Sequence, residues 1–211
     1  MRSVKHIFSI ISVLLCFALT LPSFGCAKAQ LDTSVVEING RTAFAATLDS
    51  FVDCFNDRYG ERYLPHFSGW TNVTIDQCAH FSGISNVERY MYCEDKSVWT
   101  LPTITVYTAP GSGSILEVTV DYDDHGSSDG MYELYEKMSE CALRCFLPDV
   151  DGDTIHTLFS DNFIATDDVV CSTLFLDSTG STLTYEHGTV GVYPYFAYGE
   201  CIHICIVGRS E

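Results

Sequence analysis

The run VWTLPTITVYTAPGSGSILEVTVDY occupies residues 98–122. Apolar and polar residues alternate in its two halves, and β-branched residues are frequent in both, which is typical of strands. We therefore predict strands at 98–107 and 114–122, joined as a β-hairpin by the loop that contains Pro110 and Gly111. A phosphate-binding loop would need a following helix and a lysine, and the sequence has neither here.

Three other segments carry apolar residues at every third or fourth position, which predicts amphipathic helices at 41–59, 131–146 and 154–163. Gly60 and Pro148 stand where the first two of these helices should end. Further strands are expected near 169–176, 182–186, 189–196 and 201–207, and 35–38 is either a short strand or a lead into the first helix. The stretch 61–95 has no regular pattern.

This order of elements predicts an α+β fold, with amphipathic helices packed on one face of an antiparallel sheet. Residues 41–122 and 131–208 both place a helix before strands, so they are possible halves, although no repeat is visible residue by residue. Residues 30–211 are long enough for a single domain with a substantial core.

The first 29 residues have the features of a secretory signal peptide. Arg2 and Lys5 precede an uncharged apolar run at 7–21, and Pro22 and Gly25 follow it. The run is about 15 residues long, short of the roughly 20 that cross a bilayer as a helix, so a transmembrane span is not expected. The sequence therefore predicts export, with a secreted, extracellular mature chain.

Two cleavage sites are consistent with this leader. Ala27-Lys28-Ala29 is an ordinary A-x-A site and would leave Gln30 as the first residue. Gly25 before Cys26 resembles a bacterial lipoprotein motif, although Ser23 stands where an aliphatic residue is usual. In that alternative Cys26 carries a lipid, and the chain is anchored at the cell surface.

The charge of the chain excludes some partners. The leader contains three of the 11 basic residues and none of the 28 acidic ones, so the mature chain has 8 basic residues and a net charge of −20. Such a surface repels phosphate backbones, and we expect no nucleic-acid partner.

The mature chain has an even number of cysteines, which in an exported protein indicates disulfide bracing. They are Cys54, Cys78, Cys93, Cys141, Cys145, Cys171, Cys201 and Cys205. Cys201 and Cys205 lie four residues apart on one predicted strand, so their Cα atoms are separated by about 13 Å, which is too far for a disulfide. Cys141 and Cys145 lie one turn apart on a predicted helix, and a disulfide between them would distort that helix. We therefore predict at least one bridge from a helix to a strand, and a local bridge between Cys78 and Cys93. Zinc is the less favoured reading, because no CxxC pair is present.

A calcium loop is one candidate site. Asp149, Asp151 and Asp153 alternate around Gly152, as carboxylates do at the start of an EF-hand-type loop. The resemblance covers only five loop positions, and the glycine and the bidentate acid of that pattern are absent. The favoured alternative is a turn that begins a helix, with Asp153 as its N-cap. No other cofactor is expected.

A tyrosine-rich strand is a candidate binding surface. Tyr193, Tyr195 and Tyr198 surround Pro194, whose missing N–H favours an edge strand. Exposed tyrosines there would suit a protein or glycan partner.

Catalysis is a weaker hypothesis. His203 alternates with Cys201 and Cys205, which could form a cysteine–histidine pair, but no nucleophile motif surrounds them. We assign no catalytic residue. The sequence thus predicts an exported, acidic, disulfide-stabilised binding protein. The alternatives are a lipid-anchored protein with the same role and an exported hydrolase of unrecognised type.

Overall fold

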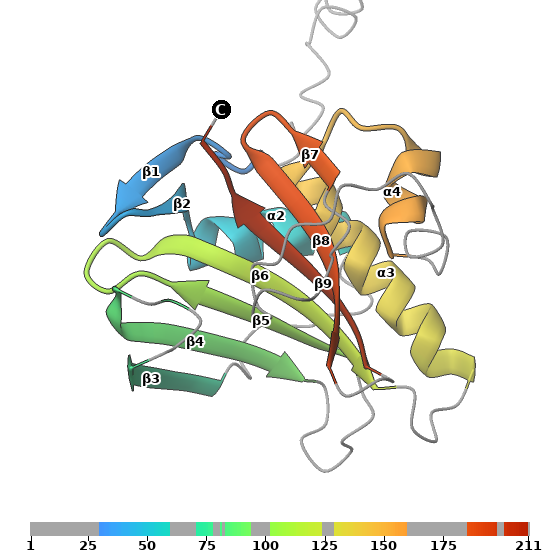
Figure 1. The fold of residues 1–211 in the computed structure, drawn as a ribbon. Helices are drawn as coiled ribbons and strands as arrows, with labels where there is room; N and C mark the ends of the chain where they lie inside the picture. Colours follow the sequence, from blue (N-terminus) through green and yellow to red (C-terminus); the bar gives the residue numbers. More distant parts are fainter. Residues whose placement is uncertain are drawn as a thin grey trace, which may run out of the picture.

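The computed structural model describes residues 30–59, 71–77, 81, 83–93, 102–123, 129–159, 185–197 and 201–210. Within these ranges the chain has an α+β fold, in which nine strands form one antiparallel sheet and three helices cover it (Figure 1). The strands are β1 Val35–Ile38, β2 Arg41–Thr47, β3 Thr71–Gln77, β4 Ser85–Cys93, β5 Thr103–Thr108, β6 Ser114–Asp123, β7 Tyr185–His187, β8 Val190–Ala197 and β9 Cys201–Gly208. The helices are α2 Leu48–Tyr59, α3 Asp129–Phe146 and α4 Gly152–Phe159.

The strands lie in the order β3-β4-β5-β6-β9-β8-β7, and β2 also pairs with β6 while β1 pairs with β2. The predicted hairpin is present as β5 and β6, with Val106 opposite Val118. The two possible halves of the chain meet where β6 pairs with β9, so their strands belong to one continuous sheet.

The main core lies between the helices and one face of the sheet. The ring of Phe44 on β2 lies 4.7 Å from that of Phe146 at the end of α3, and the ring of Phe51 on α2 lies 5.8 Å from that of Phe146. Valines and isoleucines at alternate positions of β5, β6 and β9 complete this core, in agreement with the period of two that strands impose. The predicted placement of amphipathic helices on one face of the sheet is confirmed.

The predicted helix 41–59 is wrong in its first third, because residues 41–47 form strand β2. Asn39 and Gly40 have positive φ angles of 51° and 80°, and Ile38 pairs with Arg41 across this two-residue turn. Asn-Gly is a strong sequence signal for such a hairpin. The helix begins one residue after Thr47, whose hydroxyl accepts a hydrogen bond from the backbone N–H of Ser50, as in an N-terminal cap.

The irregular stretch 61–95 contains two strands that the sequence reasoning missed. In β3 and β4, Thr74 pairs with Glu88, and the Thr74 hydroxyl donates a 2.8 Å hydrogen bond to the Glu88 carboxylate. The other predicted elements agree with α3, α4, β1, β7, β8 and β9, whereas the strand expected at 169–176 lies outside the described residues.

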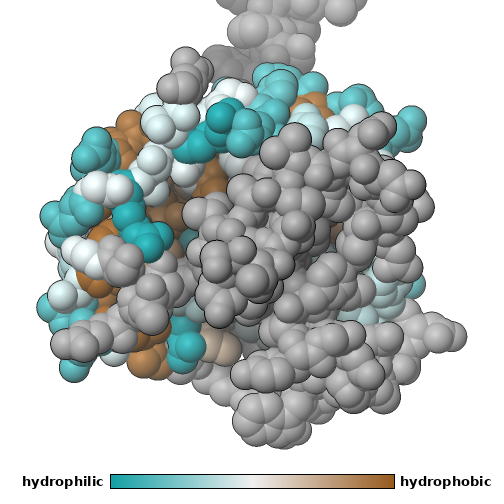
Figure 2. All heavy atoms as spheres, in the orientation of Figure 1, coloured by the Kyte–Doolittle hydropathy of each residue, from teal (hydrophilic) through white to brown (hydrophobic). Residues whose placement is uncertain are grey.

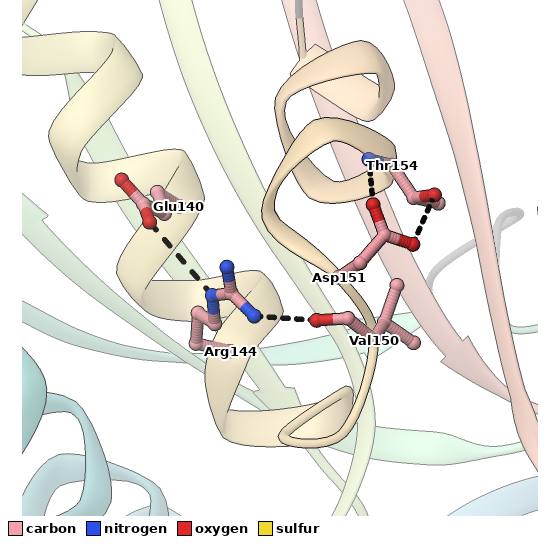
Figure 3. Close-up of polar contacts among 5 residues, drawn as sticks. All are labelled: Glu140, Arg144, Val150, Asp151 and Thr154. Atoms are coloured by element: carbon pink, nitrogen blue, oxygen red, sulfur yellow. Dashed lines mark hydrogen bonds and ion pairs between the residues drawn. The ribbon is translucent and has the colours of Figure 1, made fainter.

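Residues 147–151 form the loop between α3 and α4, and side chains from both helices contact this loop (Figure 3). Arg144 donates a 2.5 Å hydrogen bond to the carbonyl of Val150 and lies 3.7 Å from the Glu140 carboxylate. Both carboxylate oxygens of Asp151 accept hydrogen bonds from Thr154, one from its N–H and one from its hydroxyl. Asp151 is therefore the N-cap of α4, and the assignment of that role to Asp153 is wrong.

No helix among the described residues has the length and apolar character needed to cross a bilayer. The leader at 1–29, including Cys26, lies outside those residues.

Candidate functional site

A surface cleft of about 270 Å³ lies where the N-terminal segment, the end of α3 and the β7–β8 turn meet. We call it the N-terminal cleft. Its lining combines apolar residues with polar ones: Phe146, Leu147, Pro148 and Val190 on the one hand, and Gln30, Thr33, Asp149, His187 and Thr189 on the other. Figure 2 shows that the described surface around this end of the molecule is largely hydrophilic.

The N-terminal wall of the cleft is held to the rest of the domain by one buried side chain and one hydrogen bond. Leu31 is buried in the main core, and the Asp32 carboxylate accepts a 3.0 Å hydrogen bond from the N–H of Ser34. The hydroxyl of Thr189 donates a 2.8 Å hydrogen bond to the carbonyl of Thr33. The first residues after the expected cleavage site are therefore held against the body of the domain.

The opposite wall is the β7–β8 turn, which Arg209 anchors. Its guanidinium lies 2.8 Å from the Glu186 carboxylate and donates to the carbonyl of Gly188, and its backbone N–H donates to the carbonyl of Thr189. Gly188 has a φ of 57°, which glycine adopts without strain. His187 is exposed on this wall, and its ring stacks on Tyr185 at 6.4 Å with an angle of 4° between the planes.

The floor of the cleft is buried and apolar. Phe146, Leu147 and Val190 are each 2% exposed or less. Asp149 is exposed at the edge, and it stands between the end of α3 and the capped start of α4. An apolar floor with a few hydrogen-bonding groups around it is the usual composition of a small-molecule site.

The three candidate calcium ligands are not brought together as a metal site. Asp151 caps α4, and hydrogen bonds from Thr154 hold the pKa of the Asp151 carboxyl below its usual value. Asp149 and Asp153 are exposed on either side of it, and no group of three acidic, histidine or cysteine side chains with metal-site geometry occurs among the described residues.

A second polar feature lies on the sheet face that the helices leave uncovered. Here Arg89, Tyr107 and Glu117 stand directly opposite one another on β4, β5 and β6. Burial raises the pKa of Tyr107 to about 12, and the nearby Glu117 and Asp121 carboxylates act in the same direction. The Thr119 hydroxyl donates a 3.2 Å hydrogen bond to Asp121. We call this surface the polar sheet face.

The strand register places candidate residues of β8 and β9, predicted from the sequence, beside the polar sheet face. Asp121 pairs with His203, and Thr119 pairs with Cys205. On the other side of β9, Tyr195 pairs with His203 and Tyr193 pairs with Cys205. The tyrosine strand β8 pairs with β7 only at 190–192, so Pro194 lies where β8 has one neighbouring strand among the described residues. Tyr198 lies outside those residues.

Four of the eight cysteines have described side chains. Cys54, Cys141, Cys145 and Cys205 carry thiols in the structure, and no disulfide links them to one another. Cys78 and Cys171 lie outside the described residues, and Cys93 and Cys201 are described only as strand positions. The Cys78–Cys93 bridge and the helix-to-strand bridge therefore stay predictions.

The chain matches no protein-family model, no curated protein and no solved structure.

Proposed function

We propose that this chain is an exported, acidic binding protein that holds a small polar ligand, of the size of one sugar residue, in the N-terminal cleft. Export rests on the leader at 1–29, and the cleft is the observation that carries the binding role. With the cleavage after Ala29, Gln30 becomes the first residue of the mature chain and lines the cleft.

The chemistry of the cleft favours a ligand with both apolar and hydroxyl-bearing faces. Its apolar floor offers burial to the C–H face of a ring, while Thr189, His187 and Asp149 supply donors and acceptors around the edge. A volume of about 270 Å³ is smaller than a typical drug-sized site and suits one ring. The net charge of −20 that remains after loss of the three basic leader residues disfavours anionic ligands, so we expect a neutral or cationic sugar.

Nuclear magnetic resonance titration of the mature chain tests this proposal. Glucosamine and glucose, added to millimolar concentration, should shift the backbone amides of Thr33, Leu147 and Thr189 together. His187→Ala should weaken binding by about tenfold, equivalent to about 1.4 kcal/mol. His156→Ala is the matched control, because His156 is exposed on α4 away from the cleft lining. Shifts confined to other surfaces, or none with either sugar, would refute the proposal.

A second candidate function, an exported thiol hydrolase, is favoured by one observation. The register places Asp121, His203 and Cys205 on adjacent positions of β6 and β9. An acid, an imidazole and a thiol in this order are the groups of a cysteine nucleophile with its base and orienting partner. The thiol of Cys205 is 4% exposed, so a substrate would have to reach a largely buried sulfur.

Hydrolysis of p-nitrophenyl acetate distinguishes the two functions. A hydrolase should lose a burst of product with Cys205→Ala and should shift its pH profile with Asp121→Asn. A binding protein should show no burst, and both variants should retain sugar binding in the N-terminal cleft. A disulfide at Cys205 in the exported protein would exclude the hydrolase.

A further inference from the structure

Two cysteines from different helices meet in the main core. Cys54 on α2 is fully buried and Cys145 on α3 is 1% exposed. Each thiol lies near enough to the other to affect the other's pKa. The neighbouring rings of Phe51 and Phe146 lie 5.8 Å apart, which independently places the two helices in close contact at this point.

The surroundings of this pair favour thiol chemistry at Cys54. Arg58, one turn further along α2, and the backbone of Leu31 both lie near the Cys54 thiol and lower its pKa. Hydrogen bonding from Cys145 and from Arg58 lowers the pKa of Cys54, whereas burial raises the pKa of Cys145. The pair therefore combines a sulfur that loses its proton readily with one that retains it, as an attacking and a resolving cysteine do.

We propose that Cys54 and Cys145 form a disulfide that joins α2 to α3 in the exported protein. The two cysteines are buried where α2 packs on α3, and closing the bond requires their sulfurs to approach to about 2.05 Å. This pairing differs from the helix-to-strand bridge expected from the sequence, and it is independent of what the N-terminal cleft binds.

The reaction needs a disulfide as oxidant, such as oxidised glutathione or a dithiol oxidoreductase. The Cys54 thiolate attacks one sulfur of the donor, breaking its S–S bond and releasing one thiolate. Cys145 then loses its proton and attacks the Cys54 sulfur of the mixed disulfide, which releases the second thiolate. Two cysteine thiols are oxidised, one donor disulfide is reduced, and the two protons pass to the released thiolates. Because both sulfurs are buried, we expect the exchange to precede the final packing of α2 on α3. At that stage Arg58, on the same helix as Cys54, is the neighbour that still favours its thiolate.

Cys141 provides the internal comparison. It lies one turn before Cys145 on the same helix and is only partly buried. A bond between Cys141 and Cys145 would distort α3, since residues one turn apart hold their Cβ atoms about 5–6 Å apart and a disulfide needs about 3.8 Å.

Peptide mapping without reduction tests the proposal on the full chain, exported with its own leader and alkylated before purification. Trypsin together with a protease that cleaves before aspartate should leave Cys54 in peptide 53–56 and Cys145 in peptide 145–148. We expect these two peptides to be recovered as one cross-linked species. Recovery of both peptides alkylated, or of peptide 53–56 linked to any other cysteine, would overturn the proposal.

Thermal unfolding of variants gives a second, independent test. The bond closes a long loop, so Cys54→Ala should lower Tm by on the order of 10 °C. Cys145→Ala should do the same, and the double variant should lose little more, because either substitution removes the same bond. Cys141→Ala is the matched control and should lower Tm by much less. Additive losses in the double variant would mean that the two residues only pack, and would overturn the proposal.

Discussion

The hydroxyl of Thr189 and the carbonyl of Thr33 form a 2.8 Å hydrogen bond between residues 156 positions apart in the sequence. This hydrogen bond joins the N-terminal segment to the β7–β8 turn at the N-terminal cleft. Thr189→Val keeps the shape of the side chain and removes the donor. We expect a loss of about 1 kcal/mol in the free energy of unfolding, measured by urea denaturation, and weaker sugar binding. Thr157→Val, at an exposed hydroxyl on α4, should change both much less.

The turn between β1 and β2 depends on Gly40. Its φ of 80° lies in the left-handed region, and no atom lies within 4 Å of an added Cβ, so any cost of a side chain there is conformational. Gly40→Ala should destabilise the protein by about 1–2 kcal/mol in urea denaturation. Gly130→Ala is the control of opposite sign, because Gly130 lies in α3 with open space around it and alanine is the better helix former. Equal stability of both variants would contradict the hairpin.

The capping contact of Asp151 predicts a response to acid. Its carboxyl pKa is lowered by the hydrogen bonds from Thr154. A lowered carboxyl pKa stabilises the fold above the unfolded value near 3.8, and this stabilisation is lost as the pH falls through the folded value. Asp151→Asn should therefore flatten the dependence of Tm on pH in this acid range, and an unchanged dependence would contradict the capping role.

Calcium provides a separate test of the same loop. Both oxygens of Asp151 are engaged by Thr154, so we expect calorimetry with millimolar calcium chloride to give no binding heat. A measurable heat that disappears in Asp151→Asn would instead support the calcium loop.

Tyr107 predicts a response to alkali. Burial raises its pKa to about 12, so the folded protein keeps this phenol protonated where an exposed tyrosine ionises near pH 10. The stability it contributes is fully present below pH 10 and falls as the pH rises towards 12. Ultraviolet titration should show that Tyr107→Phe removes a tyrosine that ionises near pH 12. Removal of one that ionises near pH 10 would contradict the buried position.

Much of the fold could be predicted from the spacing of apolar residues, because burying one face of a helix or strand imposes a regular spacing on the sequence. The hairpin of β5 and β6 and the helix α3 were predictable for that reason. The spacing of Phe44 and Leu48, four residues apart, predicts a helix where strand β2 lies, although Asn39-Gly40 is a stronger local signal and indicates the hairpin. Strands β3 and β4 are partly exposed, with Val73 39% exposed, so their residues are under weaker pressure to alternate.

The candidate sites were harder to predict than the fold. The N-terminal cleft joins residues 30–33, 146–149 and 187–190, which share no motif and meet only through the packing of α3 and the β7–β8 turn. The proximity of Cys54 and Cys145 likewise depends on how α2 packs against α3. Composition indicated disulfides, but pairing requires distances that the sequence does not contain.

The proposed role of the N-terminal cleft depends on export, because cleavage after Ala29 both removes the leader and leaves Gln30 at the cleft. Mass spectrometry of the intact protein, purified from the cells that produce it, measures this directly. We predict a chain that begins at Gln30, or at a lipid-bearing Cys26 in the anchored alternative. A soluble chain that retains Met1 to Ala29 and carries eight reduced cysteines after residue 29 would contradict it.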